Sequence, residues 1–224
     1  MINTVGIVGL GAIGALYAER FRNVFPKENV ICIADADRIK RYRKGGVFVN
    51  GQRLDITYVS GDDASPVDLL IYATKYYSLE DAAKMSAKAC GDDTIVMSFL
   101  NGVISEDIIA DIIHPKKLLY TTVQAMDAKK EGNQIIYHQS GNVTFNEKDN
   151  HISESVNEVN ELFEKCGIAH SNPDDIMRQL YSKWMLNVGV NQTCAFSPVG
   201  SVSSAPSLCF SFSSRSIFAP FCSI

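Results

Sequence analysis

The sequence predicts an α/β fold with a doubly wound parallel sheet, and three observations support this. Apolar runs alternate with helical patterns through the first 126 residues, as in strand–helix–strand units. The apolar runs are uniformly hydrophobic, as strands buried on both faces must be. The first run leads through the glycine-rich stretch Gly9–Gly14 into a helical pattern. This combination is typical of a Rossmann-type fold.

Each element of the predicted sheet region has its own run of residues. The strands, in chain order, are predicted at Thr4–Val8, Val30–Ala34, Leu69–Ala73, Thr94–Phe99 and Leu118–Ala125. The helices are predicted at Ala12–Arg22, Asp37–Lys44, Leu79–Ala89 and Ser105–Ile113. Ser78 and Ser105 are candidate N-caps of the last two helices, because a serine oxygen can accept a hydrogen bond from a helical N–H.

Antiparallel structure is expected at two places. Asn50-Gly51 separates two short strand patterns, and these residue types tolerate the positive φ angles of a two-residue hairpin. After residue 126 the pattern becomes antiparallel in character, with strands predicted at Gln134–His138 and Asn142–Phe145 around Ser140-Gly141.

Two helices and an unusual tail complete the chain. The amphipathic segment Ser153–Lys165 predicts one helix. The second is expected to begin at Asn172-Pro173-Asp174-Asp175, with asparagine as the N-cap and proline in the first turn. Residues 197–224 contain ten serines, one arginine and no Asp, Glu or Lys. We therefore expect a dinucleotide-binding domain (residues 1–168), the start of a truncated helical substrate domain (169–196) and an atypical Ser-rich apolar tail (197–224).

The bulk composition argues against several classes of function. The 224 residues are 46% hydrophobic and carry a formal net charge of −4, whereas a sequence-independent nucleic-acid binder needs a basic face. No run reaches the roughly 18 apolar residues that span a bilayer. The six cysteines include no Cys-x-x-Cys pair, so no metal site is expected. The N-terminus lacks the basic region of a signal peptide, which favours a cytoplasmic location.

The stretch Gly9-Leu10-Gly11-Ala12-Ile13-Gly14 is the predicted phosphate-binding loop. Gly9 permits the tight turn, Gly11 leaves room for a pyrophosphate, and Gly14 lets the helix lie close to the strand. The N–H groups and the dipole at the helix start attract phosphate. A glycine-rich turn that binds nothing is the alternative, and the strand–turn–helix context disfavours it.

Asp35 is a candidate determinant of coenzyme choice, because it follows the second predicted strand, 21 residues after Gly14. A carboxylate there can hydrogen-bond the adenosine ribose and repel a 2′-phosphate, which favours NADH. Arg38, Lys40 and Arg41 lie just beyond and could instead hold that phosphate. Asp35 is also a good helix N-cap, and this alternative stays open.

Further polar residues are candidates for the reaction centre. Lys75 and Asn101 each follow an apolar strand, and open α/β sheets bind ligands outside the carboxyl ends of their strands. Lys183, Asn187 and Asn191 are spaced at i, i+4 and i+8, which places them on one helix face. A lysine there can protonate an oxygen, and the amides can orient a polar ligand. The alternatives are a solvated lysine, a plain Asn-Gly turn and an incidental polar stripe.

Taken in order, these motifs resemble the ketopantoate reductase (2-dehydropantoate 2-reductase) family over roughly residues 3–196. The matching residues are Gly9–Gly14, Thr74-Lys75, Leu100-Asn101-Gly102, Lys183, Asn187 and Asn191. The segments Asn50-Gly51 and Lys130-Glu131-Gly132-Asn133 are similar as well. The resemblance implies NADPH-dependent reduction of ketopantoate to pantoate, as in pantothenate biosynthesis.

The resemblance also implies a role for each candidate residue. Lys183 is expected to be the general acid that protonates the ketone oxygen. Asn187 and Asn191 are expected to hold the substrate, Asn101 to contact both cofactor and substrate, and Lys75 to contact the cofactor. The implied partner is a small 2-keto acid rather than a nucleic acid or a membrane, and a homodimer is left open.

The sequence departs from the family pattern at two places. The family usually has a basic residue where this chain has Asp35, so NADH stands beside NADPH as a candidate cofactor. The family continues into a helical domain with a substrate-binding serine and a cofactor-binding glutamate, which residues 197–224 do not match. We therefore expect weak or absent reductase activity. The open alternatives are another 2-keto or 3-hydroxy acid dehydrogenase and a non-catalytic nucleotide-binding module.

Overall fold

The computed structural model describes residues 1–196, with the side chains of residues 1–189. The chain divides into two compact units, Met1–Leu180 and Tyr181–Ile224. The expected domain boundary at residue 168 stays a prediction, and the Ser-rich tail lies outside the described residues. Within the described part, no helix combines the length and apolar character that crossing a membrane requires.

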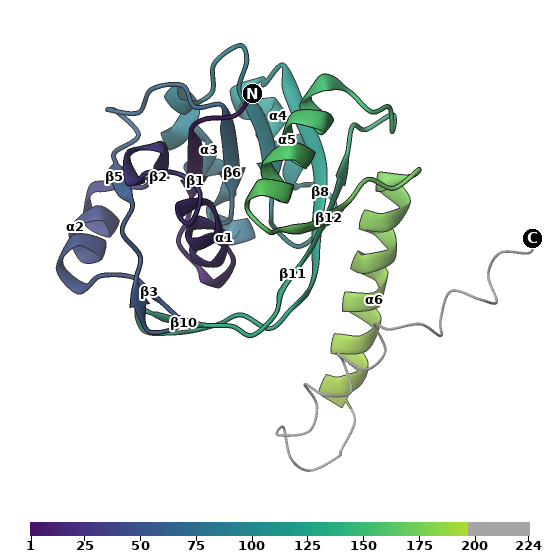
Figure 1. Cartoon of the computed structure of the whole chain (residues 1–224). Coiled ribbons are helices and arrows are strands. Elements are labelled where there is room, and N and C mark those ends of the chain that lie inside the picture. Colours follow the sequence, from purple (N-terminus) through teal and green to yellow (C-terminus); the bar gives the residue numbers. More distant parts are fainter. Residues whose placement is uncertain (197–224) are drawn as a thin grey trace, which may run out of the picture. The chain divides into compact units, whose positions relative to one another are not determined.

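An eight-stranded, mainly parallel sheet forms the centre of the first unit (Figure 1). In spatial order its strands are β12 (Ala169–Ser171), β11 (Ser140–Asn146), β8 (Lys117–Met126), β7 (Ile95–Ser98), β6 (Leu69–Tyr72), β1 (Val5–Val8), β2 (Val30–Ile33) and β5 (Thr57–Val59). The β8–β11 pair is antiparallel. From β1 the chain first adds β2 and β5 on one side and then β6, β7 and β8 on the other. This is the strand order of a dinucleotide-binding sheet, and it confirms the predicted fold class.

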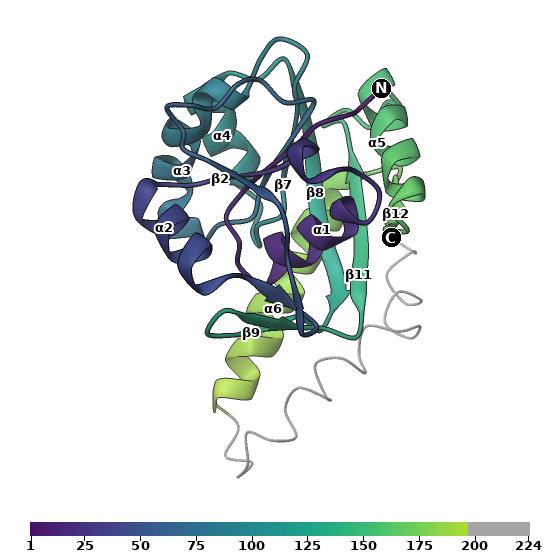
Figure 2. The same cartoon turned by 60° about the vertical axis from the view of Figure 1, so that its left-hand side comes forward.

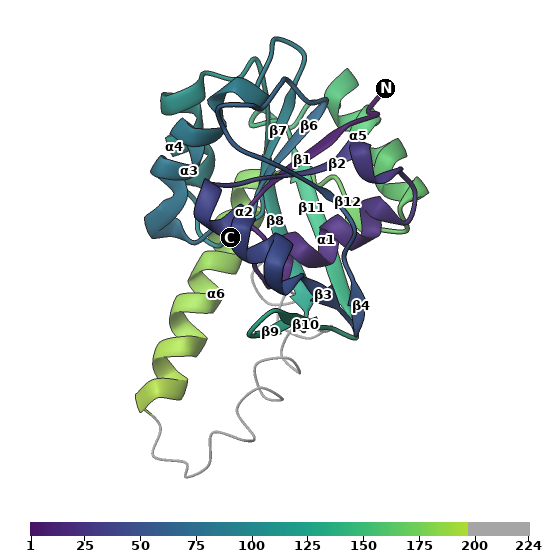
Figure 3. The ribbon, with the colours of Figure 1, turned by 90° about the vertical axis from the view of Figure 1, so that its left-hand side faces the viewer.

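Helices cover both faces of this sheet (Figures 2 and 3). They are α1 (Ala12–Arg22), α2 (Ala36–Gly45), α3 (Leu79–Ser86), α4 (Ser105–Ile113) and α5 (Glu154–Lys165), with short 3-10 turns η1 (Lys27–Asn29), η2 (Tyr76–Ser78) and η3 (Ala87–Ala89). The last helix, α6 (Ile176–Phe196), begins in the first unit and continues into the second. On one face, Phe21 of α1 and Phe163 of α5 are fully buried in a shared core. On the other face, α3 and α4 pack over Leu70 and Val96. The central strands are therefore apolar on both sides.

A second sheet of four short strands lies beside the first. It consists, in order, of β4 (Gln52–Arg53), β3 (Phe48–Val49), β10 (Gln134–Ile136) and β9 (Lys129–Glu131). The predicted Asn50-Gly51 hairpin is confirmed, because these residues have φ angles of 47° and 81° and β3 pairs antiparallel with β4.

The antiparallel character predicted after residue 126 is confirmed, because β10 pairs antiparallel with β9 and β11 pairs antiparallel with β8. The two strands around Ser140-Gly141 do not pair with each other, and β10 also pairs, in parallel, with β3. The intervening residues are held by side chains: Asn50 accepts a hydrogen bond from the Tyr137 N–H, and Asp127 accepts from the N–H groups of His138 and Gln139. The strand β10 therefore ends in the small sheet, and a short connection leads to β11 in the large sheet.

The helix starts differ from the predicted caps. Ser153, for which no cap was predicted, caps α5, because its Oγ accepts from the Val156 N–H at 3.2 Å. The expected Asn172 cap of the last helix is wrong, since that helix begins at Ile176 and Asp175 accepts from the Arg178 N–H at 2.9 Å. The Asn172 amide instead donates to a carbonyl oxygen of β11. A tertiary contact thus replaces the local cap.

The two serine caps predicted for α3 and α4 are also wrong. Ser78 precedes α3 but makes no capping bond through its side chain. Ser105 is the first residue of α4, after the N-cap Ile104. The Ser105 hydroxyl instead donates to the buried carboxyl group of Glu106 at 2.7 Å. Burial makes that bond worth more than an exposed cap.

Candidate functional site

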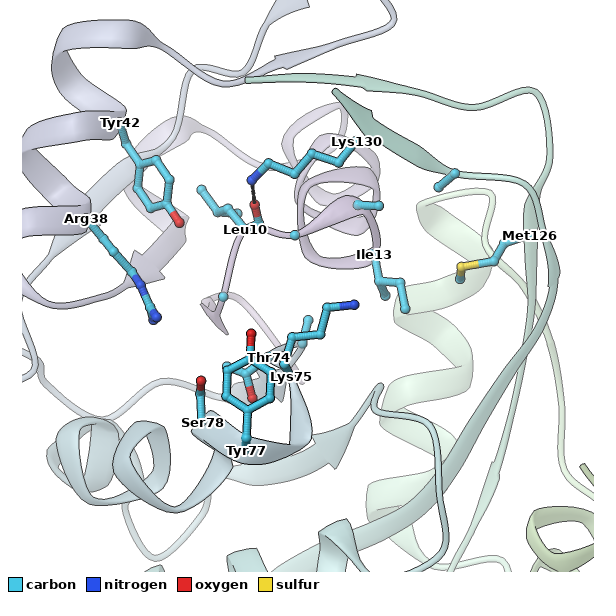
Figure 4. A pocket seen from close by; sticks show the side chains of 15 residues that line it. Leu10, Ile13, Arg38, Tyr42, Thr74, Lys75, Tyr77, Ser78, Met126 and Lys130 are labelled. Carbon is cyan, nitrogen blue, oxygen red and sulfur yellow. Dashed lines mark hydrogen bonds between the residues drawn. The ribbon is translucent and has the colours of Figure 1, made fainter. Parts of the chain in front are cut away.

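A cavity of about 360 Å³ opens at the carboxyl ends of β1 and β6, within the first unit (Figure 4). Gly9, Leu10, Gly11, Ala12 and Ile13 of the predicted loop line it. The opposite walls come from α2, from the segment after β6 and from the β8–β9 region. Because the strand order changes direction between β1 and β6, this is the position where doubly wound sheets bind ligands.

The glycines of the loop are needed by the backbone itself. Gly9 has a φ of 102°, and a Cβ there would lie 2.9 Å from the carbonyl oxygen of Ala73. A Cβ on Gly14 would collide with the carbonyl oxygen of Gly9, so Gly14 packs the helix against the strand and does not line the cavity. At Gly11 the nearest atom to an added Cβ is 3.8 Å away, which leaves the approach to α1 open. No side chain caps α1, so its first N–H groups are free to bind an anion.

Thr74 and Lys75 continue the wall of the cavity after β6. The Thr74 hydroxyl is buried and has no hydrogen-bond partner among the described residues. Buried polar groups in native proteins are nearly always paired, so this hydroxyl fits the polar group of a bound ligand. Figure 4 shows the Lys75 side chain reaching into the cavity towards Ile13. Together with the open start of α1, these residues fit a nicotinamide dinucleotide.

Asp35 and Arg38 form an ion pair at the start of α2. One carboxylate oxygen of Asp35 accepts from the Arg38 N–H at 2.8 Å, which caps the helix, and the other lies 3.3 Å from Arg38 Nε. Arg38 lines the cavity and Asp35 does not. The capping alternative is therefore confirmed, while a ribose contact by Asp35 stays a prediction.

Lys130 lines the cavity from β9, and the sequence reasoning assigned it no role. Its Nζ donates to the carbonyl oxygen of Leu10 at 2.8 Å (Figure 4). Burial, followed by the nearby charge of Arg41, lowers the pKa of this lysine. In the sequence, only the similarity of Lys130-Glu131-Gly132-Asn133 to the family pattern draws attention to this lysine. The parallel pairing of β10 with the distant β3, which carries the lysine to the loop, has no local signature.

The remaining predicted residues are not among those that line this cavity. Asn101 is exposed in the loop between β7 and α4 and does not line it. Lys183, Asn187 and Asn191 lie on α6, in the second unit, as their helical spacing predicts. Lys183 is half-buried, and burial lowers its pKa to about 8. The side chain of Asn191 lies outside the described residues. The substrate-side roles therefore stay predictions.

Comparisons with known proteins agree with this geometry. The family model described as ketopantoate reductase PanE/ApbA matches residues 5–150. A 2-dehydropantoate 2-reductase from Pyrococcus horikoshii is 28% identical over 199 residues, which are 88% of this chain and 62% of the relative. The chain thus spans about three fifths of the length of the curated relatives it matches.

Two solved structures share the fold at low identity. One is a putative 2-dehydropantoate 2-reductase from Enterococcus faecalis, with 22% identity and a TM-score of 0.68. The other is D-mandelate dehydrogenase with NADH and anilino(oxo)acetate, with 22% identity and a TM-score of 0.76. Each match covers 92% of this chain and 70% of the solved one.

Proposed function

The chain belongs to the ketopantoate reductase PanE/ApbA family, and from this premise we propose that it binds a reduced nicotinamide dinucleotide and reduces a 2-keto acid such as ketopantoate to the 2-hydroxy acid. The cavity beside Gly9–Ile13 is the observation that carries the proposal. It combines an uncapped helix start, a buried hydroxyl that has no partner in the described part of the chain, and cationic side chains. These groups complement a ligand with phosphates and polar rings.

The proposed chemistry assigns a proton-donating role to Lys183. A bound reduced coenzyme supplies the hydride. Lys183 donates a proton to the ketone oxygen as negative charge develops there. A pKa of about 8 suits this role, because the ammonium group is mostly protonated at neutral pH yet is a stronger acid than an ordinary lysine. Asn187 and Asn191 hold the hydroxyl and carbonyl groups of the substrate, and Asn101 contacts both cofactor and substrate, as the family resemblance implies.

The Asp35–Arg38 ion pair supports NADH as the preferred coenzyme. The Asp35 carboxylate already engages the guanidinium group of Arg38, and Arg38, unlike Lys40 and Arg41, lines the cavity. The predicted contact of Asp35 with the ribose would add repulsion of a 2′-phosphate. We therefore assign NADH to this chain, although the family resemblance implies NADPH.

The decisive experiment measures binding first and turnover second. The purified chain is titrated with NADH and NADPH, with coenzyme fluorescence as the signal. Oxidation of each coenzyme is then followed with ketopantoate, 2-ketoisovalerate and benzoylformate as substrates. We expect micromolar NADH binding and only slow oxidation dependent on ketopantoate, in line with the weak activity expected from the sequence.

The other outcomes separate the alternatives. No binding of either coenzyme would overturn the proposal. Binding without turnover of any keto acid would indicate a non-catalytic nucleotide-binding module. Turnover of one of the other two keto acids, with ketopantoate inert, would indicate a different 2-keto acid dehydrogenase.

A further inference from the structure

Lys130 belongs to the small sheet, but its side chain contacts the loop of the large sheet. Its Nζ donates to the carbonyl oxygen of Leu10 at 2.8 Å and lines the same cavity as Gly11. A lysine ammonium group has three N–H donors. The bond to Leu10 uses one of them and leaves two for a ligand in the cavity (Figure 4).

The charge of Lys130 is not neutralised by the described part of the chain. No carboxylate among those residues forms an ion pair with it. The neighbouring charge that acts on it is the guanidinium group of Arg41, which has the same sign. A partly desolvated cation that also experiences a second positive charge is stabilised when an anion binds beside it.

The position of Lys130 is fixed before any ligand binds. The Asn133 amide, in the turn between β9 and β10, donates to the carbonyl oxygen of Gly45 at the end of α2, at 2.7 Å. The N–H of Phe48 donates to the carbonyl oxygen of Asn133 at 2.9 Å. The first bond attaches the β9–β10 hairpin to α2, and the second bond and the β10–β3 pairing attach it to β3. A preorganised ammonium group loses little conformational entropy on binding, so more of its interaction contributes to affinity.

We propose that Lys130 is a pyrophosphate ligand, whose ammonium group, oriented by the Leu10 carbonyl, binds phosphate oxygens beside the N–H groups of α1. This assignment rests on the proposed function, because it needs a dinucleotide in the cavity. Since NADH and NADPH share the pyrophosphate, Lys130 contributes equally to both. The preference between NADH and NADPH then depends on the residues at the start of α2. The competing explanation is that Lys130 is only a latch that holds the loop in shape.

Two substitutions distinguish a pyrophosphate ligand from a residue that only holds the loop in shape. Lys130→Gln keeps an N–H donor for the Leu10 carbonyl but removes the charge, whereas Lys130→Met removes both. Lys129→Gln is the matched control, because Lys129 is exposed like Lys130 and adjacent on the same strand, but does not line the cavity. Lys130→Arg restores the charge. Each variant is titrated with NADH, NADPH and ADP-ribose, and each thermal melting curve is recorded without ligand.

We expect the dissociation constants of all three ligands to rise about tenfold in Lys130→Gln and Lys130→Met. The ratio of NADH to NADPH affinity should stay constant, Lys130→Arg should recover most of the binding, and Lys129→Gln should match the unaltered chain. The melting temperature of Lys130→Gln should be unchanged. Raising the salt concentration should weaken binding less in Lys130→Gln than in the unaltered chain.

Two results would overturn the assignment. If Lys130→Gln binds NADH and ADP-ribose as tightly as the unaltered chain, Lys130 is a latch and the proposed function stands. If the unaltered chain binds neither coenzyme nor ADP-ribose, the proposed function fails and the role of Lys130 falls with it.

Discussion

Asp35→Asn should shift coenzyme preference towards NADPH while leaving the fold intact. Asparagine caps a helix about as well as aspartate, so the bond to the Arg38 N–H, 2.8 Å long, can persist. The substitution removes the negative charge that lies 3.3 Å from Arg38 Nε. The guanidinium group is then free to pair with a 2′-phosphate, and the repulsion between that phosphate and the carboxylate disappears.

The size of the shift follows from these two electrostatic contributions. Both partners of the ion pair are about half exposed, so the pair contributes about 1 kcal/mol at most. Removing the repulsion of the 2′-phosphate contributes a similar amount. The two contributions add up to about 2 kcal/mol. This corresponds to a tenfold to thirtyfold change in the ratio of the NADH and NADPH dissociation constants.

Fluorescence titration of both coenzymes tests this reasoning. Asp37→Asn is the matched control, because Asp37 lies on the same helix, is 90% exposed and pairs with Lys40 instead. We expect its ratio of affinities to equal that of the unaltered chain. An unchanged ratio in Asp35→Asn, or an equal shift in Asp37→Asn, would refute the role of the Asp35–Arg38 pair.

Three further predictions concern single side chains. Thr74→Val should weaken NADH binding several-fold without lowering the melting temperature, because the buried hydroxyl that it removes has no partner among the described residues; an unchanged dissociation constant would contradict the fit of this hydroxyl to a ligand. Lys183→Ala should lower kcat by about 10²–10⁴-fold with little effect on the NADH dissociation constant. In the unaltered enzyme kcat should fall as the pH rises above about 8, since the general acid then loses its proton; a flat pH–rate profile would argue against this role. Burial raises the pKa of Glu106 from 4.5, its ordinary value, to about 7. Between these two values the native state binds more protons than the unfolded chain, so the free energy of unfolding should decline as the pH rises from the lower value to the higher one. Glu106→Gln should therefore raise the melting temperature more at pH 8 than at pH 5, and an equal change at both would count against a buried charge.

Sequence reasoning was most successful where one local pattern decides the structure. The apolar strands and the helix Ala12–Arg22 follow from periodicity, and the fold class follows from their alternation. The loop glycines follow from sterics: Gly9 needs a positive φ, and Gly14 packs directly against the Gly9 carbonyl. These requirements involve neighbours close in sequence, so residue types alone reveal them.

The missed features depend on contacts between distant segments. Asn172 had the residue type of a cap, but a carbonyl oxygen of β11 binds its amide, and the helix starts later. Lys130 reaches the loop because β10 pairs with β3, which is more than 80 residues earlier in the chain. Asp35 suited two roles by residue type, and only the position of Arg38 showed that it caps the helix. Side-chain chemistry therefore gave candidates, and tertiary geometry selected among them.

The attachment of the β9–β10 hairpin to α2 has a consequence for engineering. Because Asn133 bonds to Gly45, a small displacement of the hairpin moves the Arg38 helix and the Lys130 ammonium group together. Directed evolution of coenzyme preference should therefore recover remote substitutions around residues 45–53 and 131–136, as well as changes beside the ribose. Libraries confined to the immediate neighbours of the nucleotide would miss this route.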